Sequence, residues 1–435
     1  MSVINYVTTN IFKQPSLFLG LVAFIGLLVQ RKSIGDVIKG TFKTIIGVII
    51  LFKGVNIIST AVSPLSSAFS TLYKLPEANQ FNPTGWLDFL GNYGTTIGIV
   101  IVSAFAINLV VARFTPIKNI FLTGHILFWM SYICVAVGVE AGLDGTALTI
   151  FATIFLALYI IIVPALLRPF VQKVTGTDSF TIGHSASVFC LIGAGVGKLV
   201  GNKEKSTEDM NIPKSFEFFR DTTIATSLIV FAVYIVVGLV IGNASSTEIF
   251  GGALGGINTI PGMQYDLFTF SLMAGLTFGA GLTVLLTGVR LMLGEIIPAF
   301  KGISDKIIPN AIPALDIPMV FSFAPNALLI GFVVSMITSI LTIVLLASTG
   351  MLAYAVIPLV VACFFDVAPG AIFANATGGR RGAIIASIVS GILIVFFVAI
   401  SIPAVFNTAA GFNQLFGGND FSIWSSLGSL IGKIF

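Results

Sequence analysis

The sequence predicts an all-α integral membrane protein with about 10–11 transmembrane helices, some of them accompanied by re-entrant hairpins. Hydrophobic residues make up 56% of the 435 residues, charged residues only 9%, and mean hydropathy is +1.04, values typical of a chain that lies in lipid. Forty-five glycines and seventeen prolines are too many for a bundle of straight helices. Backbone groups freed at bilayer depth must be satisfied by protein or by a water-filled cavity, so broken helices indicate a transporter-like binding site.

Apolar stretches long enough to cross roughly 30 Å of hydrocarbon place the spans along the chain. Residues 186–201 are too short and too rich in glycine for a span, and we expect them to form one arm of a re-entrant hairpin. Lys and Arg follow alternate spans, which by the positive-inside rule places those loops in the cytoplasm and the N-terminus outside. The expected spans lie near residues 16–30, 41–62, 92–112, 122–140, 146–167, 223–242, 267–289, 327–348, 351–365 and 382–406.

The most charged stretch of the chain, residues 202–222, marks a boundary within a single polytopic domain. We interpret it as a solvated cytoplasmic loop that joins a first half, 1–201, to a second half, 223–435. Two apolar segments break at similar sequences, FSFAPNALL (321–329) and FDVAPGAIFANA (365–376). This similarity indicates paired hairpins and inverted repeats.

The two histidines of the chain, His125 and His184, each follow a glycine within long apolar surroundings. A titratable ring at bilayer depth is costly unless it lines a cavity or meets a partner. We therefore predict that both rings bind a ligand; the alternative is that each only ties down backbone groups.

Asp316 is the third polar residue that the apolar pattern does not explain. It lies in NAIPALDIPMVFSFAPNA (310–327), where prolines remove backbone donors and interrupt helix continuity. A carboxylate can accept hydrogen bonds from two adjacent hydroxyl groups, which suits a sugar or polyol, and we predict a ligand-facing or proton-binding role. The alternative is a structural ion pair with a distant base such as Arg290.

Several classes of function are not expected. The chain contains no Walker A sequence and no serine in a nucleophile elbow, so we expect no catalytic residue. The histidines have no nearby carboxylate at ligand spacing, so we expect neither a metal site nor another cofactor. Cys134, Cys190 and Cys363 have unrelated spacings and are interpreted as inert core thiols. The basic residues are dispersed along one membrane face, so nucleic-acid binding is not expected.

Several motifs resemble one known family over most of the chain, in order and at similar spacing. They are RKSIGDVIKGTFKTIIG (31–47), KNIFLTGHILF (118–128), SFTIGHS (179–185), GNKEKSTEDMNIP (201–213), AFKGISDKIIPNAIPALDIP (299–318), FSFAPNALLIGF (321–332) and IFANATGGRRGA (372–383). The family is that of the sugar-permease (IIC) components of bacterial phosphoenolpyruvate-dependent phosphotransferase systems, and the L-ascorbate branch is the most similar.

The resemblance implies a homodimer in the bacterial cytoplasmic (inner) membrane, in which each subunit has a substrate-carrying core domain and a V-shaped scaffold domain. It implies that the core moves like an elevator and that a cytoplasmic IIB partner transfers phosphate from a phosphocysteine to the sugar. A IIA component completes the relay. The permease then supplies position and release and needs no nucleophile of its own.

The resemblance also implies a set of substrate contacts. His125, His184 and Asp316 match the contacts of the ascorbate branch, whereas Trp129 and Ser185 stand where that branch has glutamines. An outer-loop contact is expected near Asn82 and Pro83. The chain also resembles the family less at its end, where residues 408–435 form only a weak apolar tail.

The two replaced glutamines affect the expected substrate. A carboxamide donates to and accepts from hydroxyl groups, whereas tryptophan offers a ring face and one donor. L-Ascorbate is the first expectation, and galactitol, a pentitol or another sugar acid are the alternatives. A facilitator or ion-coupled symporter that releases unmodified substrate is the rival from another class.

Overall fold

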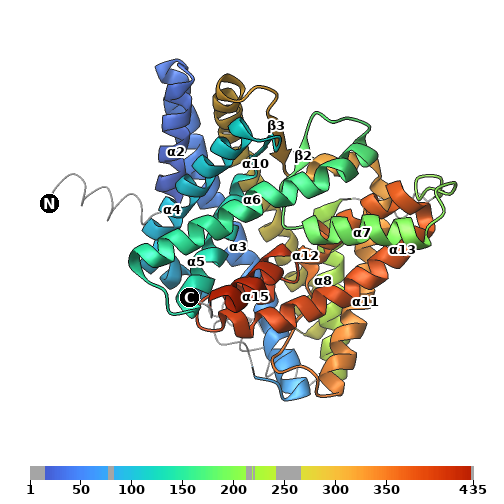
Figure 1. Ribbon diagram of the computed structural model, residues 1–435. Helices are drawn as coiled ribbons and strands as arrows, with labels where there is room; N and C mark the ends of the chain where they lie inside the picture. The colour runs from blue at the N-terminus through green and yellow to red at the C-terminus, as the bar shows by residue number, and fades with distance from the viewer. Residues whose placement is uncertain (1–14, 77–82, 212–217, 219–220, 242–265, 433–435) are drawn as a thin grey trace.

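The computed structural model describes residues 15–76, 83–211, 218, 221–241 and 266–432, and these residues are mostly helical (Figure 1). Seven of the described helices are long and apolar enough to cross a membrane, in agreement with the predicted all-α membrane class. The main helices are α2 (Pro15–Val29), α3 (Ile34–Tyr73), α4 (Pro83–Phe114), α5 (Gly124–Glu140), α6 (Gly145–Thr175), α7 (Ser187–Val200), α8 (Thr222–Ile241), α10 (Leu267–Ile307), α11 (Pro325–Ser348) and α13 (Ala368–Ser401).

One predicted span, 351–365, is wrong. Residues 351–359 are not helical, and a continuous helical path begins only at α12 (Val360–Ala362), passes through a π-helical segment, η5 (Cys363–Val367), and enters α13. In an α-helix the amide of residue 369 would donate to the η5 carbonyl four residues before it. Residue 369 is a proline and has no amide hydrogen to donate. The wider π register accommodates this missing donor, so the expected break at 365–376 does not form.

The chain breaks instead at Gly378 and Gly379, whose φ values of −150° and 60° are not helical. The other predicted break is right, because a 3₁₀ helix, η4 (Ile317–Phe323), ends before α11 begins at Pro325. The segment before Gly378 therefore forms a separate short helical arm.

The short helix α7 packs along this arm, and the two lie side by side (Figure 1). With 14 residues, α7 is too short to cross the hydrocarbon core, as expected for residues 186–201. A side chain on Gly193 or Gly197 would collide with backbone atoms of α13. Small residues thus allow the two backbones to approach closely, as in helix packing within membranes.

The charged segment after α7 does more than connect the two halves. The Glu208 carboxylate accepts hydrogen bonds from the Asn326 and Ala327 amides at 3.2 and 3.0 Å, which satisfies donors at the start of α11. The Asn202 amide donates to the Gly378 carbonyl at 2.8 Å. The described part of this segment is therefore exposed at most of its residues and is also bonded to the second half of the chain.

The C-terminal region also differs from the expected weak tail. It forms α14 (Ala410–Phe416) and α15 (Asp420–Gly432), and many of their residues are buried. Trp424 of α15 stacks on Phe155 of α6 with ring centroids 5.1 Å apart, and its indole nitrogen donates to the Phe155 carbonyl at 3.3 Å. The helix α15 is too short for a span but forms part of the core.

A small parallel sheet, absent from the sequence-based expectations, lies among the helices. Its strands are β1 (Asn119–Phe121), β2 (Thr181–Ile182) and β3 (Ile312–Leu315), in the order β1-β3-β2. On the outer edge of β1, the Asn108 side chain of α4 accepts from the Phe121 amide and donates to the Asn119 carbonyl, both at 3.0 Å. The Asn108 side chain thus makes the two hydrogen bonds that a further strand would make, so these backbone groups at the buried edge of β1 have partners.

Candidate functional site

Each of the three predicted polar residues follows one strand of this sheet. His125 comes four residues after β1, His184 two residues after β2, and Asp316 directly after β3. Because β1 and β2 both pair with β3 in parallel, the three strands end on the same side of the sheet. The sheet thus brings together residues that lie 191 positions apart in the sequence (125 to 316).

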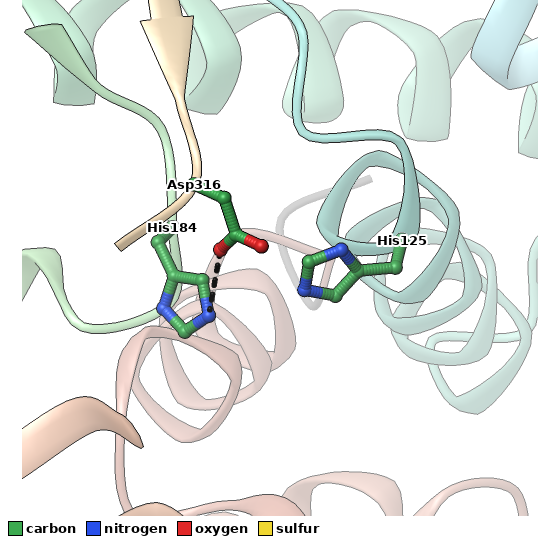
Figure 2. Close-up of side chains that lie close together, drawn as sticks. All are labelled: His125, His184 and Asp316. Atoms are coloured by element: carbon green, nitrogen blue, oxygen red, sulfur yellow. Dashed lines mark ion pairs between the residues drawn. The ribbon is translucent and has the colours of Figure 1, made fainter. Parts of the chain in front are cut away.

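Figure 2 shows the Asp316 carboxylate between the two imidazole rings. The distance from His184 Nε2 to Asp316 Oδ1 is 3.6 Å, and the ring centroids of His125 and His184 lie 5.8 Å apart. Asp316 Oδ1 also accepts the Ile317 amide at 2.8 Å, which places the carboxylate at the start of η4. The structure therefore joins the three residues in one cluster, while their role as substrate ligands stays a prediction.

A backbone hydrogen bond determines which ring nitrogen of His184 carries the hydrogen in the neutral form. The Ala186 amide donates to His184 Nδ1 at 3.1 Å, so Nδ1 acts as the acceptor. In the neutral ring the hydrogen then lies on Nε2, which faces Asp316 and the cavity described below. His184 thus presents a hydrogen-bond donor to Asp316 and the cavity.

The cluster could hold a metal ion, because histidine and aspartate are common metal ligands and one ligand atom from each residue lies within 4.8 Å of the others. Spacing along the sequence does not show this proximity, because Asp316 is remote from both histidines along the chain. A histidine that binds a metal through Nε2 carries its hydrogen on Nδ1 and donates it to an acceptor. At His184 that position meets a donor, the Ala186 amide at 3.1 Å, and an acceptor, Asp366 Oδ1 at 3.5 Å, and the shorter contact favours the hydrogen on Nε2.

Five of the seven predicted site residues line one cavity of about 100 Å³: His125, Trp129, His184, Ser185 and Asp316. Of the other two, Asn82 lies outside the described residues, and Pro83 begins α4 without a described side chain. The remaining wall is mostly apolar, with Leu51 and Val55 from α3, Leu285 and Leu286 from α10, and Phe412 and Phe421 from the C-terminal region. One polar side and one apolar side suit a small molecule with both hydroxyl groups and C–H faces.

Two polar residues of the cavity were missed by the sequence analysis, Asp366 and Asn419. Asp366 lies in η5 and is 3% exposed, and it accepts a hydrogen bond from the Ser185 hydroxyl at 2.6 Å. An acid within an apolar run is a functional candidate by default, so this signal was present in FFDVAPG. No comparable pattern marks Asn419.

The aromatic side of the cavity is centred on Trp129. Its ring lies 4.9 Å from that of Phe412 at an angle of 31°, and Phe52 packs edge-on against it at 5.9 Å. Aromatic contacts of this kind hold the indole in a defined orientation. Trp129, which stands where the ascorbate branch has a glutamine, therefore forms part of the cavity wall.

Comparison with known proteins agrees with the family that the motifs resemble. The family of PTS (phosphotransferase) system sugar-specific permease components matches residues 10–420. A protein of Mycoplasma pneumoniae, the ascorbate-specific PTS system EIIC component, is 25% identical over 97% of this chain and 70% of its own length. Since the family match covers nearly the whole chain and the helices suit a multi-pass membrane protein, this chain belongs to the sugar-specific permease components of phosphotransferase systems.

Proposed function

We propose that the protein carries L-ascorbate, or a related sugar acid, through the bacterial cytoplasmic membrane for phosphorylation by a cytoplasmic IIB partner with a phosphocysteine. The observation that carries this proposal is the buried cavity in which His125, His184 and Asp316 meet at the ends of three parallel strands. The name of the Mycoplasma pneumoniae relative supports the choice of substrate. A IIA component would recharge the IIB partner.

We further propose a homodimer with its N-terminus outside, in which a core domain moves against a scaffold in an elevator-like motion. His125, His184 and Asp316 each follow a strand of one sheet, whereas four of the facing apolar residues belong to the long helices α3 and α10, which pack against each other. Substrate would therefore lie between two groups of elements. Movement of one group against the other would expose the substrate to the cytoplasm.

An uncharged polyol such as galactitol or a pentitol is the second candidate substrate, and the charge of the cavity favours it. The described lining residues include Asp316 and Asp366 but no Lys or Arg. L-Ascorbate is an anion at neutral pH and would meet two acidic groups without a basic partner. A polyol avoids this repulsion.

Transport into proteoliposomes tests the proposal against its rival. We expect labelled L-ascorbate to appear inside as a phosphate ester only when phosphoenolpyruvate and the soluble carrier proteins, IIB included, are present in the lumen. Parallel reactions with galactitol identify the preferred substrate. Accumulation of unmodified substrate driven by an ion gradient, without the phosphate relay, would show that the protein is a symporter.

Ser185→Gln is expected to shift relative affinity toward L-ascorbate if the native substrate is another compound. The carboxamide supplies both a donor and an acceptor where serine has one hydroxyl that already bonds to Asp366. The measurement is the ratio of dissociation constants for L-ascorbate and galactitol on purified protein. Ser185→Ala is the control, because it removes the hydroxyl without adding an amide; an unchanged ratio in Ser185→Gln would contradict a contact at this position.

A further inference from the structure

Asp420, the first residue of α15, is bonded to the segment that carries His184. The side chain is 5% exposed. Its Oδ1 atom accepts the Val188 amide at 2.8 Å, and its Oδ2 atom accepts the Tyr159 hydroxyl at 2.9 Å. The Asp420 amide in turn donates to the Ser185 carbonyl at 3.1 Å. One residue of the C-terminal region thus contacts the His184 segment at two points and supports it through α6 at a third.

The same segment is held from other directions as well. The His184 carbonyl accepts the Ser187 hydroxyl at 2.6 Å and lies 3.2 Å from the Tyr159 hydroxyl. On the sheet side, the Gly183 amide donates to the Leu315 carbonyl at 2.9 Å. The turn of residues 183–188 is therefore fixed between β3 on one side and the pair Asp420 and Tyr159 on the other.

The conformation of this turn decides how His184 faces the cavity. The Ala186 amide reaches His184 Nδ1 only because the turn brings residue 186 back toward the ring, and this bond leaves Nε2 facing Asp316. The Ser185 side chain faces Asp366 from the same turn. A change in the turn would therefore displace two of the cavity's polar groups together.

We propose that Asp420 is a positioning residue of the substrate site, which holds the turn 183–188 so that His184 and Ser185 face the cavity. Asp420 does not itself belong to the cavity lining, whereas its neighbours Asn419 and Phe421 do. It acts through the turn and not through contact with substrate. This inference rests on the proposed function, because it is tested by measuring substrate affinity.

The role depends on hydrogen-bond geometry rather than on charge, and this leads to different expectations for two substitutions. In Asp420→Asn, the amide oxygen can still accept from Val188, and the amide nitrogen can donate to the Tyr159 oxygen. The Tyr159 hydrogen is then available to the His184 carbonyl. Asp420→Ala removes both side-chain contacts and leaves the Val188 amide without its acceptor.

The test is the affinity of purified full-length variants for labelled L-ascorbate and galactitol, measured together with thermal unfolding. We expect Asp420→Ala to weaken binding by about tenfold or more and Asp420→Asn to remain within about threefold of the unsubstituted protein. Ser422→Ala is the matched control. Ser422 is also buried in α15 and bonds to Ser401 and to the Gly418 amide at 2.8 and 2.7 Å, and neither partner belongs to the turn 183–188. It should lower the unfolding temperature with normal affinity.

Three results would overturn the inference: normal affinity in Asp420→Ala, equal loss in Asp420→Asn and Asp420→Ala, or equal loss in Ser422→Ala. If Asp420→Ala does not fold, Tyr159→Phe takes its place, because it removes one contact of the same carboxylate. Weaker binding by Tyr159→Phe would then support the inference, and normal binding would overturn it. His125→Ala distinguishes a failure of the proposed substrate site from a failure of the positioning role of Asp420. If His125→Ala binds substrate normally, the proposed site itself is wrong. If His125→Ala binds weakly while Asp420→Ala binds normally, only the positioning role is wrong.

Discussion

Asp316→Asn is expected to remove most substrate uptake while the protein still folds. The substitution keeps the shape but removes the charge and one acceptor, and a lost hydrogen bond to a buried charged group typically costs about 1.5–3 kcal/mol of binding, roughly 10- to 150-fold. Asparagine serves as well as aspartate at the start of a helix, so the hydrogen bond to the Ile317 amide and the start of η4 can be kept. The measurement is substrate affinity of the purified variant in detergent, alongside uptake in proteoliposomes.

The competing explanation for Asp316 is a structural ion pair with Arg290. Arg290 is exposed, whereas Asp316 Oδ1 lies 3.6 Å from His184 Nε2 inside the cavity. A structural ion pair predicts lower stability and normal affinity in the fraction that folds. Normal affinity in Asp316→Asn would remove Asp316 from the site, and Arg290→Gln is the control that should leave affinity unchanged.

His125→Ala is expected to weaken binding by about 1–3 kcal/mol, the usual cost of leaving a buried partner without its hydrogen bond. His125 Nδ1 is buried and has no hydrogen-bond partner among the described residues. A group that gains its partner only from substrate contributes to affinity and not to folding. The unfolding temperature of the substrate-free variant should therefore stay the same or rise.

This pairing of weaker binding with unchanged stability separates the two explanations of His125. If the ring only ties down backbone, the substitution should destabilise the protein and leave the affinity of the folded fraction normal. Asn56→Ala is a suitable control, because Asn56 Oδ1 is also buried without a partner among the described residues and Asn56 lies outside the cavity lining. It should bind substrate normally.

The sequence was sufficient to identify the membrane class and the three polar residues His125, His184 and Asp316, because each depends on local chemistry. A histidine or aspartate in a long apolar run is visible without knowledge of the fold, and the broken segment around Pro325 is marked by its proline. Asp366 carried the same signal but was interpreted as part of a helix break, whereas η5 keeps the chain helical there.

The remaining features depend on contacts between distant segments. Strands of two to four residues have no detectable periodicity, and β1 and β3 pair across more than 190 residues, so no pattern could predict the sheet. The cavity residues Phe412 and Phe421 lie in helices too short for a span, which made their segment resemble a tail. Only the folded chain shows that this segment closes the cavity.

The strand order has a consequence for synthesis of the protein. The central strand, β3, is the last of the three to leave the ribosome, and β1 and β2 pair with it rather than with each other. Until residues 312–315 are made, the first two strands have no partner for their inner edges, although both lie in buried positions of the finished protein. Closing such long loops is slow compared with the pairing of adjacent helices. The cluster of His125, His184 and Asp316 is thus completed late in synthesis, and a nascent chain that ends before β3 lacks Asp316, however many of its helices have already entered the membrane.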